Sequence, residues 1–369
     1  MKLLVVCRAY NNMAGGIERM AAALMNDMCM RGHDISLLTW DLADAQSFYD
    51  FNSKIQWYSL DLGAHQKKAG WGLRFKRMLK MRRILANAKP DIILAFQHGT
   101  FLATRVYTMG LGIPVIAAER EGPGRFDHLK AGKWRWLIYQ SFRLASRITI
   151  QCESYRNNYP AYLHKSIVTI PNPVFPSQSF ANPAGERGKR KKILSVGRLE
   201  YQKNQAALVD AFAQIQREFP DWDLFLVGEG EDRKALKKKI ESLGLQNRIS
   251  MPGAVKDMDA VYCSSHLFCL SARWEGFPNV IAESLSHGLP AVGFEKCCGV
   301  GELIASGVNG LLAAGNGDAG ALARTLRILM ADDDLRARMG KAGIESMRQY
   351  EPDKIFDRWE SFLCTVSGL

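Results

Sequence analysis

Two glutamates with a helix-starting segment between them form a pair whose spacing suits ligand chemistry. Glu275 is followed by Gly-Phe-Pro-Asn, and Glu283 stands eight residues further on. Pro278 fits the first turn of a helix, where a missing N–H costs nothing, so Glu275 is expected on the preceding loop and Glu283 inside the helix. The N–H groups of that first turn belong to Asn279, Val280 and Ile281. A helix start attracts phosphate, so this segment predicts a site for hydroxyls and a diphosphate together.

Two cations form the second candidate group. The run Ser195-Val196-Gly197 is an apolar strand that ends in a glycine, and the following loop carries Arg198 and Lys203. Two basic side chains at the carboxyl edge of a sheet are what a diphosphate clamp without a metal requires. Taken alone, either residue is more often an ordinary surface charge.

Two glycine-rich turns accompany them. Gly228-Glu229-Gly230 follows a strand and permits close backbone approach to a base or ribose, and Gly15-Gly16 opens a helix after the first strand. Neither is a G-x-G-x-x-G fingerprint, and no acidic residue ends the second strand, so NAD binding is not indicated.

The elements that position these groups form two alternating series of strands and helices. The chain has 369 residues, of which 47% are apolar and 23% charged, as in an ordinary folded protein. Residues 1–172 and 173–351 each read as a doubly wound α/β domain, separated by a turn-rich linker that begins at Pro171. A last helix at about 352–369 is expected to pack back on the first domain. Two such domains facing each other would create a central cleft.

Cysteine spacing and hydropathy narrow the class of protein. The eight cysteines contain no C-x-x-C pair, which favours reduced, buried thiols over a zinc site, so no metal is expected. No apolar run approaches the roughly 20 residues of a membrane-spanning helix, and Arg8 interrupts the first apolar run too early for a signal peptide. A cytoplasmic-type location is expected.

The net charge of +12 lies in the first half of the chain, because residues 1–172 carry 24 basic and 12 acidic residues and the remainder carries 25 of each. Three interpretations stay open: a solvated helix face, contact with the anionic inner face of the cytoplasmic membrane, and nucleic-acid binding, which no accompanying motif favours. Tryptophans interleaved with the cations are typical of membrane contact. The candidate membrane-facing residues are Lys67, Lys68, Trp71, Arg74, Lys76, Arg77, Lys80, Arg83, Lys133, Trp134 and Trp136.

The order of motifs along the chain resembles the retaining GT-B glycosyltransferases of family GT4. The resemblance is carried by GGIER with RGHDISLLT, IPNPV, VGRLEYQKN, LVGEGEDR, and EGFPNVIAESLSHGLPAVG with its E-x7-E. It implies a GT-B fold, a nucleotide-sugar donor held by the second domain and an acceptor held by the first. Donor-contacting or catalytic positions implied by the resemblance are Arg198, Lys203, Glu275, Glu283, Gly15, Gly16, Gly228, Glu229, Phe277, Pro278, Asn279, Val280 and Ile281.

One segment departs from the family pattern. Many relatives have a histidine after the fourth strand of the first domain, where this chain reads Ala117-Ala118-Glu119-Arg120. Arg120 stands at that place, so a histidine role cannot be carried over to it. His98, after the preceding strand, is a second possible contact to donor or acceptor, although an ordinary loop histidine is the commoner case.

The resemblance implies transfer of a hexose or N-acetylhexosamine, with a UDP-linked donor favoured over GDP-mannose. The implied acceptor is a lipid-anchored bacterial glycan such as lipopolysaccharide core, O-antigen or exopolysaccharide precursor. The reaction would be a front-face substitution in which the leaving diphosphate accepts the proton of the acceptor. Two alternatives stay open: a sugar-nucleotide epimerase of the same fold, against which the E-x7-E spacing counts, and a non-enzymatic basic binder of membrane or nucleic acid, which would leave the charge-balanced second half unexplained.

Overall fold

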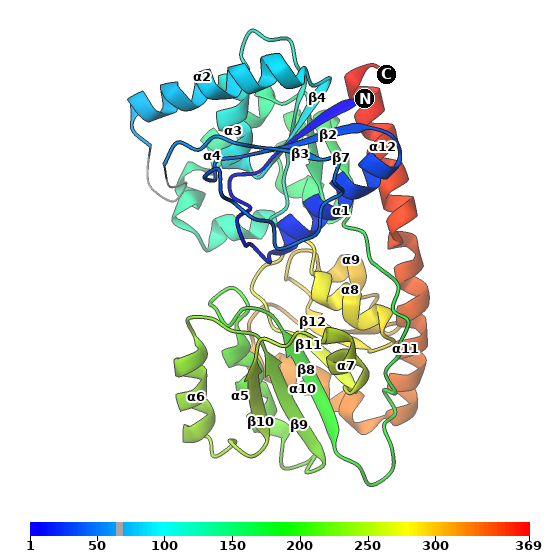
Figure 1. Ribbon diagram of the computed structural model, residues 1–369. Helices are drawn as coiled ribbons and strands as arrows, with labels where there is room; N and C mark the ends of the chain where they lie inside the picture. Colours follow the sequence, from blue (N-terminus) through cyan, green and yellow to red (C-terminus); the bar gives the residue numbers. More distant parts are fainter. Residues whose placement is uncertain (64–68) are drawn as a thin grey trace. The chain divides into compact units, whose positions relative to one another are not determined.

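Two parallel β-sheets are the framework of this chain (Figure 1), in a computed structural model that describes residues 1–63 and 69–369. The chain divides into unit 1, which comprises Met1–Pro173 and Asp353–Leu369, and unit 2, which comprises Val174–Pro352. Each unit has its own sheet with helices packed against it. The predicted fold class, α/β with two doubly wound parallel sheets, is confirmed.

The sheet of unit 1 has seven strands in the order β3-β2-β1-β4-β5-β6-β7. Its centre is apolar and buried, as a parallel sheet covered on both faces requires; Leu3 pairs with Ile35 on one side and Ile92 on the other. The strands are β1 (Lys2–Val6), β2 (Asp34–Thr39), β3 (Gln56–Ser59), β4 (Ile92–Phe96), β5 (Val115–Ala118), β6 (Arg147–Ile150) and β7 (Ile167–Thr169).

The helices of unit 1 are amphipathic and bury one face. In the first of them, Met20, Leu24 and Met28 recur at helical spacing and are buried. The helices are α1 (Gly16–Met30), α2 (Trp71–Ala88), α3 (His98–Tyr107), α4 (Arg135–Ser141) and α12 (Pro352–Ser367), with short 3₁₀ turns at Pro123–Asp127, Lys130–Trp134, Phe142–Leu144, Glu153–Asn158 and Ala161–Ser166.

The last helix, α12, completes the core of unit 1, although it is separated from the rest of that unit by unit 2 in the sequence. Trp359 is fully buried, and the guanidinium of Arg120 lies 5.0 Å from its ring centre. At the surface, Arg31 Nη1 lies 2.8 Å from Glu360 Oε2, and Arg358 donates to the carbonyl of Thr169 across 2.7 Å. Apolar burial and ion pairs together therefore attach α12 to the strands and helices of the chain's first half.

The sheet of unit 2 has six strands in the order β10-β9-β8-β11-β12-β13. The strands are β8 (Lys191–Val196), β9 (Trp222–Val227), β10 (Ile249–Gly253), β11 (Leu267–Leu270), β12 (Ala291–Phe294) and β13 (Gly310–Ala313). The helices are α5 (Gln205–Ile215), α6 (Arg233–Ser242), α7 (Met258–Cys263), α8 (Asn279–Ser286), α9 (Val300–Leu303), α10 (Ala319–Ala331) and α11 (Asp333–Met347), with a 3₁₀ turn at Arg348–Tyr350. Because β8 pairs with β9 on one side and β11 on the other, the chain reverses its winding direction between β8 and β11. Ligands bind at such a switch point in open α/β sheets.

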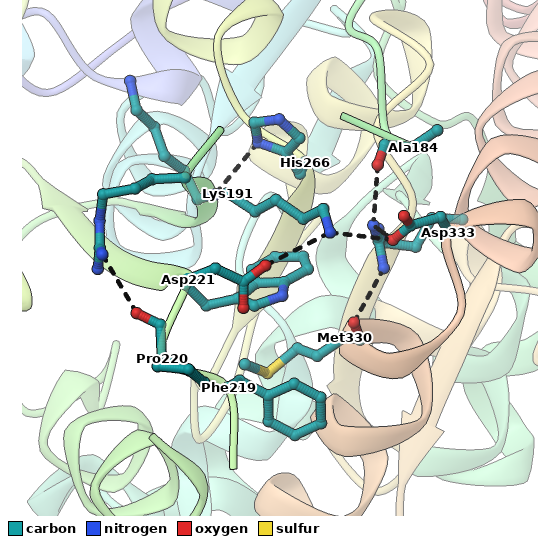
Figure 2. A network of polar contacts seen from close by, with 12 residues as sticks. Ala184, Lys191, Phe219, Pro220, Asp221, His266, Met330 and Asp333 are labelled. Carbon is teal, nitrogen blue, oxygen red and sulfur yellow. Dashed lines mark hydrogen bonds and ion pairs between the residues drawn. The ribbon is translucent and has the colours of Figure 1, made fainter. Parts of the chain in front are cut away.

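A buried arginine, Arg336, connects the start of unit 2 to its last helices. Figure 2 shows the surrounding polar network, in which Ala184, Lys191 and Asp333 are labelled. Arg336 has no exposed surface, donates to the carbonyl of Ala184, pairs with Asp333, and stacks 4.8 Å from the ring centre of Trp222. Lys191 lies 3.2 Å from the same Asp333 carboxylate. The buried guanidinium thus attaches the linker at Pro183 and Ala184 to the last helices and to the first residue of β9, Trp222.

None of the helices in the described ranges, 1–63 and 69–369, combines the length and the apolar character needed to cross a membrane.

Candidate functional site

Two glycine loops of unit 2 touch backbone to backbone where β8 and β9 end. Gly197 donates its N–H to the carbonyl of Val227, and a Cβ placed on Gly228 would lie only 2.1 Å from the carbonyl oxygen of Gly197. A Cβ on Gly230 would meet the carbonyl of Leu199 at 2.2 Å. No other residue type fits such an approach, so these glycines fix the shape of the sheet edge on which the candidate residues stand.

The predicted cation and carboxylate meet at this edge. Lys203 Nζ lies 2.7 Å from Glu275 Oε1, and their side chains are only 16% and 6% exposed. The two residues come from the loops after β8 and β11, which flank the switch point of the sheet. A partly buried ammonium beside a carboxylate can bind a diphosphate oxygen through the one and a sugar hydroxyl through the other.

A polar network that sequence reasoning missed joins the same two loops. Gln202 Nε2 donates to the carbonyl of Trp274 across 2.9 Å, and Arg273 Nη2 donates to Asn204 Oδ1 across 2.9 Å. Asn204 adopts a left-handed backbone with φ 51°, which asparagine tolerates better than most residues. These residues lie within or next to the Arg198–Lys203 loop and the Glu275 loop. Their closeness in sequence to the predicted site residues is the signal that could have identified them.

Arg198 remains largely accessible. Its side chain is 74% exposed, and its Nη2 lies 3.0 Å from Glu200 Oε1. Gln205 Nε2 donates a hydrogen bond to the carbonyl oxygen of Arg198 across 2.9 Å. The backbone at this position is therefore fixed while the guanidinium extends into solvent, where an anionic ligand can reach it.

Glu283, the second glutamate of the E-x7-E pair, accepts a hydrogen bond from a side chain of another helix. Tyr262, a buried residue of α7, donates its hydroxyl to Glu283 Oε2 across 2.8 Å. His287 stacks on the Tyr262 ring with centres 4.8 Å apart. Tyr262 was not among the predicted site residues, because nothing in the local sequence links it to a helix 21 positions away.

The start of α8 differs in detail from the prediction. Pro278 precedes the helix, which begins at Asn279. The N–H of Asn279 donates to the carbonyl of Phe277, and that of Ile281 donates to the carbonyl of Pro278, both at 2.8 Å. Two of the three expected phosphate donors thus already have partners, because Phe277–Asn279 closes a three-residue turn and Pro278–Ile281 a four-residue turn. The ring of Phe277 is buried and packs 5.8 Å from Tyr350, so it supports the loop from within.

Glu229 and the glycines of the first helix are the remaining donor candidates. Glu229 is exposed, with Arg233 Nη1 at 3.1 Å from its Oε1. In unit 1, Gly15 precedes α1, which begins at Gly16, and a Cβ on Gly15 would lie 2.1 Å from Glu18 Oε2. Gly15 therefore leaves room for the carboxylate of Glu18 at the start of α1.

His98 is the first residue of α3, directly after β4. Its Nε2 lies 2.7 Å from Ser141 Oγ. Burial lowers the pKa of His98 to about 4, with a smaller contribution from the charge of Arg125. Burial also raises the pKa of Glu119, against the opposing effect of Arg125.

Arg120 does not face a ligand within unit 1. It is 5% exposed and donates to the carbonyl of Ile170 across 3.0 Å and to Thr149 Oγ1 across 2.9 Å, beneath Trp359. Burial lowers the pKa of Arg120 to about 9, so the guanidinium keeps its charge at neutral pH. The expectation of a substrate contact is corrected to an internal role: this residue joins β5, β6 and α12.

The basic helix α2 presents most of its predicted residues to solvent. Trp71 is 86% exposed, Phe75 57% and Leu79 41%, which forms an apolar stripe at four-residue spacing. Exposed or half-buried cations flank this stripe: Arg74, Lys76, Lys80 and Arg83. The second predicted cluster is exposed as well: Lys133, Trp134 and Trp136. Lys67 and Lys68 lie outside the described residues.

Arg77 is the exception, and its assignment to the membrane-facing set was wrong. It is 5% exposed and donates to the carbonyl of Leu62 across 3.2 Å. Its position, four residues before Met81 and eight before Leu85, places it on the buried face of α2.

Comparison with known families matches both halves of the chain to glycosyltransferase models. Residues 14–178 match the model described as Glycosyltransferase Family 4, and residues 177–346 match the model described as Glycosyl transferases group 1.

Curated relatives extend over the whole chain. One is the GalNAc-alpha-(1->4)-GalNAc-alpha-(1->3)-diNAcBac-PP-undecaprenol alpha-1,4-N-acetyl-D-galactosaminyltransferase of Campylobacter jejuni, 25% identical and covering 100% of this chain and 99% of the relative. Another is the amylovoran biosynthesis glycosyltransferase AmsD of Erwinia amylovora, 24% identical and covering 98% and 99%.

Solved structures share the fold at low sequence identity. Sucrose-phosphate synthase from Thermosynechococcus elongatus aligns with a TM-score of 0.85 at 15% identity, covering 99% of this chain and 98% of that one. Anabaena HepE in complex with UDP-glucose aligns with a TM-score of 0.77 at 18% identity, covering 99% and 100%. These likenesses identify the two-unit architecture as the GT-B fold.

Proposed function

This chain belongs to the GT4-type glycosyltransferases of the GT-B fold, and we propose that it moves a hexose or an N-acetylhexosamine from a UDP-linked donor to a lipid-anchored bacterial glycan with retention of configuration. The observation that carries the proposal is the 2.7 Å pair of Lys203 and Glu275 at the switch point of unit 2, with the exposed Arg198 on the same loop as Lys203. The two cations can bind the diphosphate of the donor, and the carboxylate can accept hydrogen bonds from the sugar hydroxyls.

In the proposed mechanism the acceptor oxygen bonds to the anomeric carbon while the bond from that carbon to the diphosphate breaks. The proton of the acceptor hydroxyl passes to the departing diphosphate on the same face of the sugar. Lys203 and Arg198 stabilise the negative charge that develops on the diphosphate, and Glu275 orients the sugar through its hydroxyls. Positioning and electrostatic stabilisation account for the rate, with no covalent intermediate on the protein.

The names of the relatives support the acceptor and donor classes. The Campylobacter jejuni relative is named for an undecaprenol-linked acceptor, and the Erwinia amylovora relative for amylovoran biosynthesis. Anabaena HepE was solved with UDP-glucose. We therefore propose a UDP-linked donor and a lipid-linked acceptor for this chain as well.

A lipid-linked acceptor places the reaction at a membrane surface, and we propose that unit 1 docks peripherally on the anionic cytoplasmic face. The supporting observation is the exposed stripe of Trp71, Phe75 and Leu79 on α2 with cations on its flanks. Aromatic side chains beside cations are suited to the headgroup region, and each cation near an anionic surface contributes about 1 kcal/mol.

The direct test is a thermal-unfolding panel with UDP, GDP and ADP and their sugar derivatives. A ligand at about 100 times its dissociation constant adds ~2.7 kcal/mol of stability, so the cognate nucleotide should raise the melting temperature clearly. Lys203→Ala should lose that shift while the unliganded variant still unfolds cooperatively. If no nucleoside diphosphate or nucleotide sugar raised the melting temperature of the wild type, the proposed donor class would be wrong.

A further inference from the structure

Ser141 determines which nitrogen of His98 carries the proton. Ser141 Oγ lies 2.7 Å from the carbonyl oxygen of Ile138, which can only accept, so the single hydroxyl proton points there. His98 Nε2 lies 2.7 Å from the same Oγ. With its own proton already donated, Ser141 must accept at that contact, so the ring N–H of His98 is at Nε2.

The other nitrogen, Nδ1, is therefore a fixed lone-pair acceptor. The low pKa of His98 keeps the ring neutral at physiological pH. The ring is held by the edge contact with Phe142, 5.2 Å between centres, and by the contact of its Nε2 with Ser141 Oγ. Within residues 1–63 and 69–369, no hydrogen bond is made to Nδ1.

The place of His98 in the fold is a ligand-binding position. β1 pairs with β2 on one side and β4 on the other, so the switch point of this sheet lies between β1 and β4. His98 is the second residue after β4 ends at Phe96, and Gln97 before it has an unusual φ of 67°. Ligands bind outside the carboxyl ends of the strands at such a point, and residues held in rare backbone conformations cluster at functional sites.

A neutral nitrogen lone pair selects its partner by chemistry. It offers nothing to a fully ionised phosphate, which has no proton to donate, and it does suit a hydroxyl group. We infer that His98 Nδ1 accepts a hydrogen bond from a sugar hydroxyl during transfer, with Ser141 as the positioning residue that fixes the tautomer. The inference rests on the proposed function and adds the group in unit 1 that would bind the sugar.

Two substitutions separate this role from a structural one. His98→Asn places an amide oxygen near the position of Nδ1 and loses the bond to Ser141, whereas His98→Gln can keep a donor toward Ser141 and loses the acceptor. If Nδ1 binds a hydroxyl, His98→Gln should reduce kcat/KM on the order of five- to tenfold, and His98→Asn clearly less. A role limited to tethering Ser141 gives the opposite ranking, and that ranking would overturn the inference.

The tautomer itself is readable in the unliganded full chain. Nitrogen-15 NMR of histidine-labelled protein at neutral pH should show His98 with an unprotonated Nδ1 and a protonated Nε2, assigned by the signals that vanish in His98→Asn. In Ser141→Ala the protonated nitrogen should no longer be restricted to Nε2. A protonated Nδ1 in the wild type would overturn the inference.

Two reactions identify the source of the hydroxyl. Hydrolysis of UDP-glucose or UDP-N-acetylgalactosamine by the variants uses no glycan acceptor, and transfer to solvent-extracted bacterial lipid-linked glycan uses one. A loss in both reactions assigns the donor sugar, and a loss in transfer alone assigns the acceptor. A wild type that turns over no nucleotide sugar would refute the proposed function, whereas an active wild type with equal losses in both variants would refute this inference alone.

Discussion

Lys203 donates to Glu275 across 2.7 Å, although the two residues are 72 positions apart in the sequence. The cation proposed to bind the diphosphate is thus paired with the carboxylate proposed to bind the sugar. An incoming diphosphate shares the ammonium with Glu275, and its negative charge competes with that of the carboxylate for the same cation. Affinity for the nucleotide and speed of transfer should therefore respond differently when one partner is changed.

Glu275→Gln is expected to bind UDP more tightly and to lose turnover. Removing the carboxylate charge leaves the largely buried ammonium of Lys203 without its counter-charge, which a diphosphate can then supply, so UDP affinity should rise about fivefold or more. Turnover should fall because the amide no longer accepts from the sugar hydroxyls as a charged group. Calorimetric titration with UDP beside steady-state kinetics checks both halves; weaker UDP binding in the variant would contradict the competition.

Arg198→Ala should be a catalytic loss without a stability loss. The side chain is 74% exposed, so its removal should change the free energy of unfolding by less than about 0.5 kcal/mol. Removing a group aimed at developing charge typically costs about 10²–10³ in rate. Arg187→Ala, at another exposed arginine of unit 2, is the matched control and should leave both kcat and the melting temperature unchanged. A full-rate Arg198→Ala would exclude this residue from the clamp.

Turnover should persist after treatment with EDTA. The prediction follows from Lys203 and Arg198, which supply the positive charge that a divalent ion otherwise supplies to a diphosphate. The measurement is nucleotide-sugar turnover by metal-stripped protein, with and without added Mg²⁺ or Mn²⁺. Activity that EDTA abolishes and a divalent ion restores would show that these two side chains do not suffice.

Binding to anionic vesicles should depend on α2. Changing Arg74, Lys76, Lys80 and Arg83 together to Glu reverses four charges beside the exposed stripe, and each cation contributes about 1 kcal/mol, so binding at low salt should fall by more than about tenfold. Arg77 stays unchanged in this variant because its replacement would disturb the buried face of the helix. Co-sedimentation at low and high salt is the measurement, with neutral vesicles as control. Equal binding of wild type to neutral and anionic vesicles would identify the patch as ordinary solvated surface.

Stability should fall as the pH falls from about 6.5 toward 4. His266 accepts from the backbone N–H of Lys192 through its Nδ1, and burial beside Arg336 and Lys191 lowers its pKa from 6.5 to about 4. Between those values the unfolded chain binds a proton that the folded chain does not, so acid favours unfolding. Thermal unfolding across this range should show a shallower decline for His266→Gln than for wild type. Because His98 carries a similar shift, the His98→Asn, His266→Gln double variant should be shallower still, and identical slopes in all three proteins would contradict the assignment.

The sequence was sufficient where the signal is local. Glycines that end strands, cations in the following loop and a carboxylate before a proline are all readable over a few residues, and Lys203 and Glu275 do come together as partners. The burial of Arg77 was readable as well, from its helical spacing with Met81 and Leu85. The excess of basic residues around it hid that periodicity.

Other features could not be predicted because they depend on distant parts of the chain. Arg120 is buried beneath Trp359, and no local pattern links those positions. The strands β3 and β13 have weak local signals, because β3 reads Gln-Trp-Tyr-Ser with no buried residue and Gly310 in β13 has low strand propensity. That glycine is required by the sheet, since a Cβ there would lie 2.1 Å from the carbonyl of Ala291.

The position of α12 has a consequence for how the chain is made. Unit 2 is continuous from Val174 to Pro352, so all of its residues are synthesised before α12. The strands of unit 1 are made before unit 2, yet Trp359 and Glu360 can reach Arg120 and Arg31 only after the whole of unit 2 has been made. The part of the chain that is made first is therefore the last to complete its core, and the Arg120 guanidinium lacks its ring partner throughout that interval. A chain truncated just before residue 352 and released from the ribosome should hold a folded unit 2 beside a unit 1 that is more readily cut by protease.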